Sequence, residues 1–261
     1  MATWITHLMI ADEVLKRLPA LDRRGFCVGN IAPDCNVENE DWTAFTPSRE
    51  IMHWMTGKSK SAADSDRFYK TYVEARKEQL VSAEERSFLA GYYAHLVADA
   101  QFQKMIRDDE RVKAMWNRLR QRPNIRTRAA GEPENWDTVK RIVPKQRRMQ
   151  EIDAMEAEYL RMHPDSGYVT EILTLKEFPD YLDYLPKGCI VRKVGVMGFP
   201  PKLDAPRPEP ICISREEYGA FVRDTVRMIT EKLREKGWGF AESQSGQHEP
   251  AAQCQNLKKP L

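Results

Sequence analysis

Apolar residues recur at helical spacing along most of the chain, with Pro and Gly between the periodic segments. An apolar stripe begins at Trp4 and Leu8 and continues to Leu18, which predicts a helix over residues 3–18. Pro19 cannot continue a helix and marks its end. The chain therefore opens on an amphipathic helix.

The clearest helix begins after Ser82. Ser82 and Glu85 have the spacing of a capping box, and the helix that they open is expected to reach about residue 107. The residues on its inward face are Phe88, Tyr92, His95, Asp99, Phe102 and Ile106. A His and an Asp thus interrupt a stripe that is otherwise aromatic or aliphatic.

Further helices are expected over residues 50–55, 61–80, 109–121, 135–162 and 214–236. Ser214 and Glu217 form a second capping-box pattern at the start of the last helix. Residues 22–48 are rich in turn formers and predict a packed functional loop. Residues 178–210 contain one run typical of a β-strand, residues 189–196. The predicted fold class is all-α, a multi-helix bundle with an irregular Pro/Gly-rich C-terminal region.

Length and composition suit one main domain. The chain has 261 residues, of which 41% are hydrophobic and 31% charged, an ordinary globular balance. We expect a single helical domain over residues 1–240. The polar end of the chain, residues 241–261, is expected to be a disordered tail.

Charge gives no signal for a nucleic-acid partner or an anionic membrane. The 41 basic and 39 acidic side chains leave a net charge of +2. Basic clusters at residues 118–128 and 140–148 are interpreted as solvated helix faces. No apolar run is long enough to span a bilayer, and the first residues lack the features of a signal peptide. The five cysteines lack CxxC spacing and suit reduced thiols, so a cytoplasmic location is expected.

His95 and Asp99 lie one helical turn apart and can point at one atom. A carboxylate in an apolar stripe is costly unless another group neutralises it. A divalent cation would do so, and His-x-x-x-Asp is a two-ligand clip for zinc. A buried His–Asp hydrogen bond of purely structural use is the alternative at this point.

Two more histidines lie in apolar segments. His7 is beside the stripe of the first helix, and His53 stands between Met52 and Trp54. Asp34 follows a Pro in a predicted turn. Together with the helical His–Asp pair, these residues offer enough donors for one tetrahedral site and part of a second. Metal binding is therefore the favoured interpretation.

Four segments resemble the zinc-dependent phospholipase C family, whose relatives include the fungal single-strand nucleases. They are Trp4-x-x-His7, Gly29-Asn30-Ile31-Ala32-Pro33-Asp34, the segment around His53, and Gly91-Tyr92-Tyr93-Ala94-His95-Leu96-Val97-Ala98-Asp99. The resemblance covers about residues 1–107. The Pro-Asp turn and the Gly-Tyr-x-x-His-x-x-x-Asp helix are its specific parts.

The resemblance implies an all-helical enzyme that hydrolyses phosphodiester or phosphomonoester bonds with metal-activated water. By position, the ligands of one zinc would be Asp34, His53, His95 and Asp99. His7 would bind a second zinc, with Asp99 bridging the two. Asp34 would also orient or deprotonate the attacking water.

Two features depart from the family pattern. In the secreted enzymes the tryptophan is the first residue and its free amine binds metal, whereas Trp4 follows Met1-Ala2-Thr3. The third zinc of the family needs histidines after the helical Asp, and the later ones here, His163 and His248, are poorly placed. The resemblance thus implies one firm zinc site and a weaker second one.

Cationic residues flank His53. Arg49 is expected to clamp a substrate phosphate during catalysis, and Lys58 to bind substrate, with Lys60 similarly placed. An exposed structural role is the alternative for each. Glu50 and His53 also match the Glu-x-x-His clip of di-iron bundles, but no other His has a Glu at that spacing.

Together these observations predict a zinc-dependent hydrolase whose substrate is a small-molecule or lipid-like phosphate ester. Two alternatives stay open. One is a non-catalytic relative in which a metal braces the helices or recognises a ligand. The other is a metallohydrolase that acts on a non-phosphate bond, since the metal does not dictate the electrophile.

Overall fold

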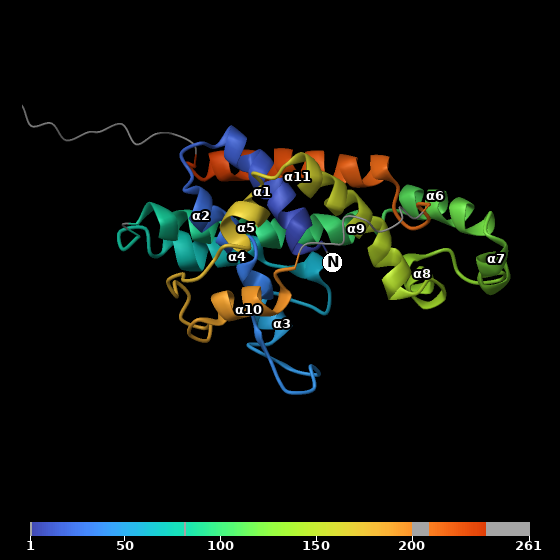
Figure 1. Cartoon of the computed structure of the whole chain (residues 1–261), viewed down its shortest axis with the longest axis horizontal. Coiled ribbons are helices and arrows are strands. Elements are labelled where there is room, and N and C mark those ends of the chain that lie inside the picture. The colour runs from blue at the N-terminus through green and yellow to red at the C-terminus, as the bar shows by residue number, and fades with distance from the viewer. Residues whose placement is uncertain (1, 81, 200–208, 239–261) are drawn as a thin grey trace, which may run out of the picture.

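The computed structural model describes residues 2–80, 82–199 and 209–238. The helices are α1 (Trp4–Arg17), α2 (Arg23–Gly29), α3 (Arg49–Met52), α4 (Ser65–Tyr69), α5 (Ala83–Met105), α6 (Asp109–Arg120), α7 (Pro123–Ala129), α8 (Trp136–Ile142), α9 (Lys145–Met162), α10 (Cys189–Met197) and α11 (Arg215–Glu235). Short 3-10 or π segments are η1 (Ala32–Asp34), η2 (Lys60–Ala62), η3 (Lys70–Glu74) and η4 (Tyr168–Ile172). Two short strands, β1 (Val37–Glu38) and β2 (Phe45–Thr46), pair antiparallel. The predicted all-α fold class is confirmed (Figure 1).

The predicted helix starts agree with the structure. Thr3 caps α1, where its hydroxyl accepts a hydrogen bond from the Thr6 amide. Ser82 caps α5 in the same way, and Ser214 opens α11 with the complete capping box. All six residues of the predicted inward stripe of α5 are buried. The two capping-box patterns in the sequence thus located the starts of α5 and α11.

Several expected elements differ from the structure. The helix expected over 135–162 is divided into α8 and α9, because Pro144 lacks an amide hydrogen and stands at the break. The segment 61–80 holds α4 and two irregular turns rather than one helix. The loop expected over 22–48 contains α2 and the strand pair. The predicted tail, residues 241–261, lies outside the described residues.

The β-like run at residues 189–196 was assigned wrongly, because it forms helix α10. Its β-branched residues favoured a strand, but the buried side chains follow helical spacing at Ile190, Lys193 and Val194. Gly188 precedes the helix with a φ of +67°, a conformation that glycine adopts without strain. Tertiary burial therefore outweighed the local strand preference.

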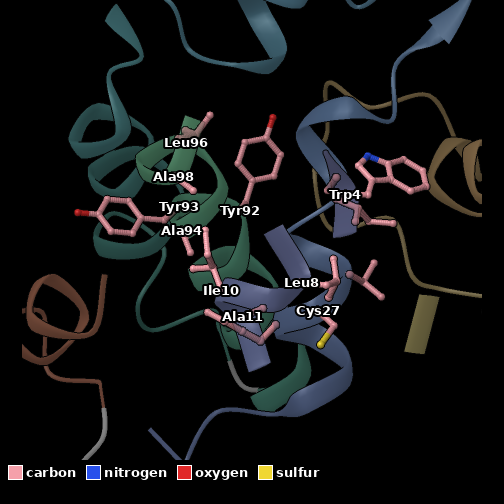
Figure 2. Packing of buried hydrophobic residues seen from close by; sticks show 14 of the residues in the cluster. Trp4, Leu8, Ile10, Ala11, Cys27, Tyr92, Tyr93, Ala94, Leu96 and Ala98 are labelled. Carbon is pink, nitrogen blue, oxygen red and sulfur yellow. The ribbon is translucent and has the colours of Figure 1, made fainter. Parts of the chain in front are cut away.

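Two hydrophobic clusters hold the described residues together. The larger one joins α1, α2, α5 and α11, and Figure 2 shows Leu8 and Ile10 of α1 pointing into the same cluster as Ala94 of α5. The smaller one gathers residues of α6, α7 and α8, which form one end of the molecule in Figure 1. Among the described helices, none combines the length and apolar character needed to cross a bilayer. A single domain over residues 1–240 stays a prediction.

The two basic clusters carry many ion pairs. One guanidinium nitrogen of Arg118, Nη2, donates to both carboxylate oxygens of Glu217, each at 3.0 Å. Arg147 lies 3.1 Å from the buried carboxylate of Glu151. The first contact links α6 to α11, and the second joins successive turns of α9, so the clusters have a structural role in addition to that of a solvated surface.

Helices α2 and α5 approach each other at three glycines. A Cβ added to Gly29 would lie 2.1 Å from the carbonyl oxygen of Phe88, and one on Gly91 would lie 2.2 Å from that of Phe26. Gly25 makes a similar approach at 2.3 Å. The two backbones therefore touch, which is possible only without side chains at these positions.

Glu156 of α9 is a buried carboxyl beneath the start of α1. It accepts hydrogen bonds from the Thr6 hydroxyl at 2.5 Å and from the Thr3 hydroxyl, and Thr6 also lies 2.8 Å from the hydroxyl of Tyr218. Burial raises the pKa of Glu156 to about 7. The network fixes the first turn of α1 against α9 and α11.

Gly91→Ala is expected to lower the free energy of unfolding by about 3 kcal/mol or more, because the added methyl group would overlap a backbone carbonyl of α2. Gly195→Ala in α10 is the matched control. No atom lies within 4 Å of its added Cβ, and the change should raise the free energy of unfolding by about 0.5–1 kcal/mol. Urea denaturation measures both, and equal stability of Gly91→Ala and wild type would contradict the contact.

Glu156 should make the protein less stable as pH rises. In the unfolded chain the carboxyl loses its proton near its ordinary pKa of 4.5, whereas the folded protein holds that proton up to about pH 7. Between these values the free energy of unfolding should fall by on the order of 3 kcal/mol more in wild type than in Glu156→Gln. Urea denaturation of both proteins at about pH 5 and about pH 8 tests this, and an unchanged difference would contradict it.

Candidate metal centre

The structure brings the five predicted ligands together from four separate elements. His7 lies on α1, Asp34 ends η1, His53 caps the end of α3, and His95 and Asp99 lie on α5. The side chains of His7, His95 and Asp99 are fully buried, and that of His53 is 2% exposed. Asp34 is 16% exposed, so the site opens to solvent on its side.

Backbone carbonyls fix the proton positions on two of the histidines. His95 Nδ1 lies 2.7 Å from the carbonyl oxygen of Asn30, and His53 Nδ1 lies 3.1 Å from that of Arg49. A carbonyl can only accept, so each Nδ1 donates its hydrogen there. In the neutral imidazole, Nε2 then keeps its lone pair and faces the carboxylates. This is the arrangement in which a histidine binds a metal ion through Nε2.

The spacing of the facing atoms fits a tetrahedral cation. His53 Nε2 lies 3.2 Å from Asp34 Oδ1 and 3.5 Å from Asp99 Oδ2, and His95 Nε2 lies 3.4 Å from the same Asp99 oxygen. Ligands about 2.0–2.1 Å from a tetrahedral zinc lie about 3.3 Å apart. Direct charge-assisted hydrogen bonds would be shorter, about 2.7–2.9 Å. These three distances therefore suit ligands of a metal ion better than a closed hydrogen-bonded cluster. The donor atoms that all lie within 4.8 Å of one another form two groups, one of Asp34, His53 and His95 and one of His7, His95 and Asp99.

His7 stands at the edge of this group. Its ring stacks on that of His95 with centroids 3.8 Å apart, and its Nε2 lies 3.7 Å from Asp99 Oδ1. Burial, with the neighbouring His95, lowers the pKa of His7 to about 4, so its imidazole is neutral near pH 7. His95 belongs both to the group with Asp34 and His53 and to the group with His7 and Asp99. It offers only one nitrogen to them, because its Nδ1 is engaged by the Asn30 carbonyl. A second ion would thus have fewer ligands.

The unsatisfied nitrogen atoms test whether a cation fits here. Within the described part of the chain, His53 Nε2, His95 Nε2 and both nitrogens of His7 are buried without a hydrogen-bond partner. Buried polar atoms are rarely left in this state, because an unmade hydrogen bond inside a protein is costly. Three imidazoles and two carboxylates form a donor set that zinc takes readily. The residues fit zinc.

The side chains of Arg49 and Lys58 are exposed, and the backbone of Arg49 holds His53. The side chain of Lys60 is not among those described. Trp4 is buried in the first turn of α1 and joined to the capping Thr3, so it offers no free amine. The clamping role of Arg49 and Lys58 stays a prediction.

Two supporting contacts were missed in the sequence. One is the Asn30 carbonyl, which orients His95. The other is the buried hydroxyl of Tyr92, which donates to the carbonyl oxygen of Met52, next to His53. Tyr92 lies on the same face of α5 as His95, so its place in the inward stripe was the available signal.

All five candidate ligands lie in the N-terminal part of the chain, which matches a known family. Residues 6–102 match the family model of zinc dependent phospholipase C. The match includes all five candidate ligands and confirms the resemblance found in the N-terminal part of the sequence. Residues 103–261 lie outside it. No curated protein and no solved structure matches the chain.

Zinc added to metal-depleted protein is expected to raise the melting temperature. At a hundredfold excess over the dissociation constant the gain is about 2.7 kcal/mol, or roughly 5–10 °C for a chain of this size. His95→Ala and Asp99→Asn should abolish the response, whereas the control His163→Asn should keep it. Differential scanning calorimetry measures the shift. A wild-type melting temperature that is insensitive to zinc would contradict the site.

Proposed function

We propose that the protein is a zinc-dependent hydrolase of phosphate esters. One zinc would be held by Asp34, His53, His95 and Asp99, and a weaker second one by His7 with Asp99. The observation that supports this is the set of facing ligand atoms 3.2–3.5 Å apart in a nearly closed interior, with Asp34 at the solvent side. We expect the enzyme to act in the cytoplasm.

The residues around the site would hold its parts in place. The carbonyls of Asn30 and Arg49 keep Nε2 of the two histidines directed at the centre. When bound, zinc would lower the pKa of a water molecule toward neutrality and offset the charge that develops on phosphate. Asp34 is the ligand that reaches solvent, so we assign to it the orientation of the attacking water and the acceptance of its proton.

Two exposed cationic residues close to His53 in the sequence favour a phosphate substrate. Arg49 begins α3, one turn before His53, and its side chain is exposed. Lys58 follows in the next loop and is also exposed. Guanidinium and ammonium groups at these positions would bind the non-bridging oxygens of a phosphate ester. Arg49 would then contribute to binding in both the ground state and the transition state.

One observation favours a second candidate function. Four of the five candidate ligands are at most 2% exposed, which is typical of closed structural zinc sites. In that case the metal would brace α1 and α5 against η1 and α3 without catalysing a reaction. A hydrolase acting on an ester or amide would share the geometry of the first proposal and differ only in its substrate.

His95→Ala is expected to reduce hydrolysis of nitrophenyl phosphate esters at least about 100-fold, because loss of a ligand should cost no less than loss of its supporting contact. Arg49→Ala should raise KM about tenfold with a smaller change in kcat. The assay includes a carboxylic ester and an anilide to test other bonds. His163→Asn is the control and should retain activity.

The outcomes separate the candidates. Zinc-loaded wild-type protein that hydrolyses none of the substrates, and whose melting temperature still depends on zinc, would overturn the hydrolase proposal in favour of the structural role. Activity on the carboxylic ester or the anilide alone would overturn the phosphate assignment and leave the metal site intact.

A further inference from the structure

A cavity of about 330 Å³ lies between the end of α1 and the end of α9. Its walls come from the last turns of α1, the connection to α2, the last turn of α9 and the segment before η4. None of the described residues that line it is a candidate metal ligand. The part that α9 and the following segment supply lies outside the stretch that matches the family model. The cavity is therefore a feature separate from the candidate metal centre.

One part of the cavity wall is apolar. Leu15 of α1 and Leu21 of the following connection belong to the buried core, and Pro19 between them is exposed. These three side chains offer a surface on which a hydrocarbon chain would lose contact with water. With its volume near the lower end of the range for small-molecule sites, about 300–1,000 Å³, the cavity suits a short ligand.

Two aromatic rings form another part of the wall. The ring centroids of Tyr159 and His163 lie 4.5 Å apart, and both side chains are partly exposed. The Tyr159 hydroxyl donates a hydrogen bond to the carboxylate of Asp12 at 2.7 Å, and the Gly167 amide donates to the same carboxylate at 3.0 Å. Asp12 is thus held by donors of the protein itself, and it fixes the position of the Tyr159 ring.

Ser166 brings an unused polar group to the cavity. The residue is 3% exposed and lines the cavity. Its hydroxyl is buried and has no hydrogen-bond partner among the described residues. Buried hydroxyl groups rarely stay in this state, because an unmade hydrogen bond inside a protein is costly. A bound molecule with a polar hydrogen would satisfy it.

The cations that line the cavity are already paired. The ammonium group of Lys16 lies 2.6 Å from the carboxylate of Glu13. The guanidinium group of Arg23 lies 3.2 Å from Asp12 and 3.3 Å from Glu171. An anionic ligand would have to compete with these carboxylates for both cations. The pairing therefore disfavours an anion.

Asp165 adds a carboxylate without a counterion. Its backbone carbonyl accepts a hydrogen bond from Arg23 at 2.8 Å, but its exposed side chain forms no ion pair with any residue that the structure describes. Four carboxylates thus stand around two cations. Burial and the carboxylates of Asp12, Glu13 and Asp165 raise the pKa of Tyr159, so the negative potential reaches the aromatic wall. Such a potential favours a cationic ligand.

We infer that this cavity binds a small aliphatic amine. Its ammonium group would lie at the Asp165 carboxylate and the Ser166 hydroxyl, and its hydrocarbon chain would lie against the apolar wall. An ammonium group carries only donors, so it suits a carboxylate and a hydroxyl, and it is also attracted to the face of an aromatic ring such as that of Tyr159. A bare metal ion would leave the apolar wall unused. The inference does not rest on the proposed function, because the cavity shares no residue with the candidate centre.

Isothermal titration calorimetry of the full chain with putrescine, a four-carbon diamine, tests the inference. Butanediol and succinate have the same chain length and are the matched neutral and anionic probes. Putrescine should bind saturably, whereas both other probes should bind about tenfold more weakly or not at all, because neither brings an ammonium group to Asp165. The contrast isolates charge from size and from apolar contact.

Two variants locate the binding. Asp165→Asn should weaken putrescine binding about tenfold, and Ser166→Ala should weaken it about threefold. The side chain of Asp165 is exposed and the Ser166 hydroxyl has no partner in the described part of the chain, so neither change should destabilise the fold. Urea denaturation checks this. Asp224→Asn removes an equally charged, exposed side chain from α11 and should leave binding unchanged.

Several outcomes would overturn the inference. They are the absence of saturable putrescine binding below about 1 mM, and binding of butanediol or succinate as tight as that of putrescine. Equal losses in Asp165→Asn and Asp224→Asn would reveal a general attraction of cations to the acidic surface and overturn it too. Calcium that displaces putrescine and depends on Asp165 would assign the cavity to a metal ion instead. Phosphoesterase activity enters none of these measurements, so failure of the proposed hydrolysis leaves the amine site standing.

Discussion

The backbones of α2 and α5 meet at Gly25, Gly29 and Gly91, where no side chain separates them. This contact sets the position of η1, which carries Asp34, relative to α5, which carries His95 and Asp99. It places the end of α2 beside the middle of α5, so the Asn30 carbonyl reaches His95 and the following turn carries Asp34 to the same point. A wider helix separation would draw both groups away from the centre.

The centre combines groups that destabilise each other unless a cation is present. Three imidazoles and two carboxylates face one another in a nearly closed interior. Such an arrangement is unfavourable for folding and favourable for metal binding, because the ligands are held in place before the ion arrives. Around the centre, the Tyr92 hydroxyl donates to the Met52 carbonyl, and the carbonyls of Arg49 and Asn30 accept from His53 and His95.

The hairpin of β1 and β2 connects the candidate metal centre to the surface of the molecule. It leaves the core immediately after Asp34 and returns at α3, one turn before His53. The ion pairs of Glu38 with α10 hold it against an element outside the stretch that matches the family model. The C-terminal part of the chain therefore contributes to how the N-terminal centre is presented, although it supplies none of the candidate ligands.

The sequence by itself determined the elements whose signals are local. The apolar stripe from Trp4 predicted α1, capping boxes predicted the starts of α5 and α11, and the inward stripe of α5 identified His95 and Asp99 as buried. The motifs also named the five candidate ligands, because their spacing resembles a known pattern. In each case the physical cause acts within one or two helical turns.

Only the tertiary structure decided the remainder. Residues 189–196 became a helix because Lys193 and Val194 are buried against the body, although their local preference is for a strand. The Asn30 carbonyl, the Tyr92 hydroxyl and the pairing of Glu38 with Lys193 join residues that are far apart in the chain. No local pattern encodes such contacts, since they arise from the path of the backbone through the folded molecule.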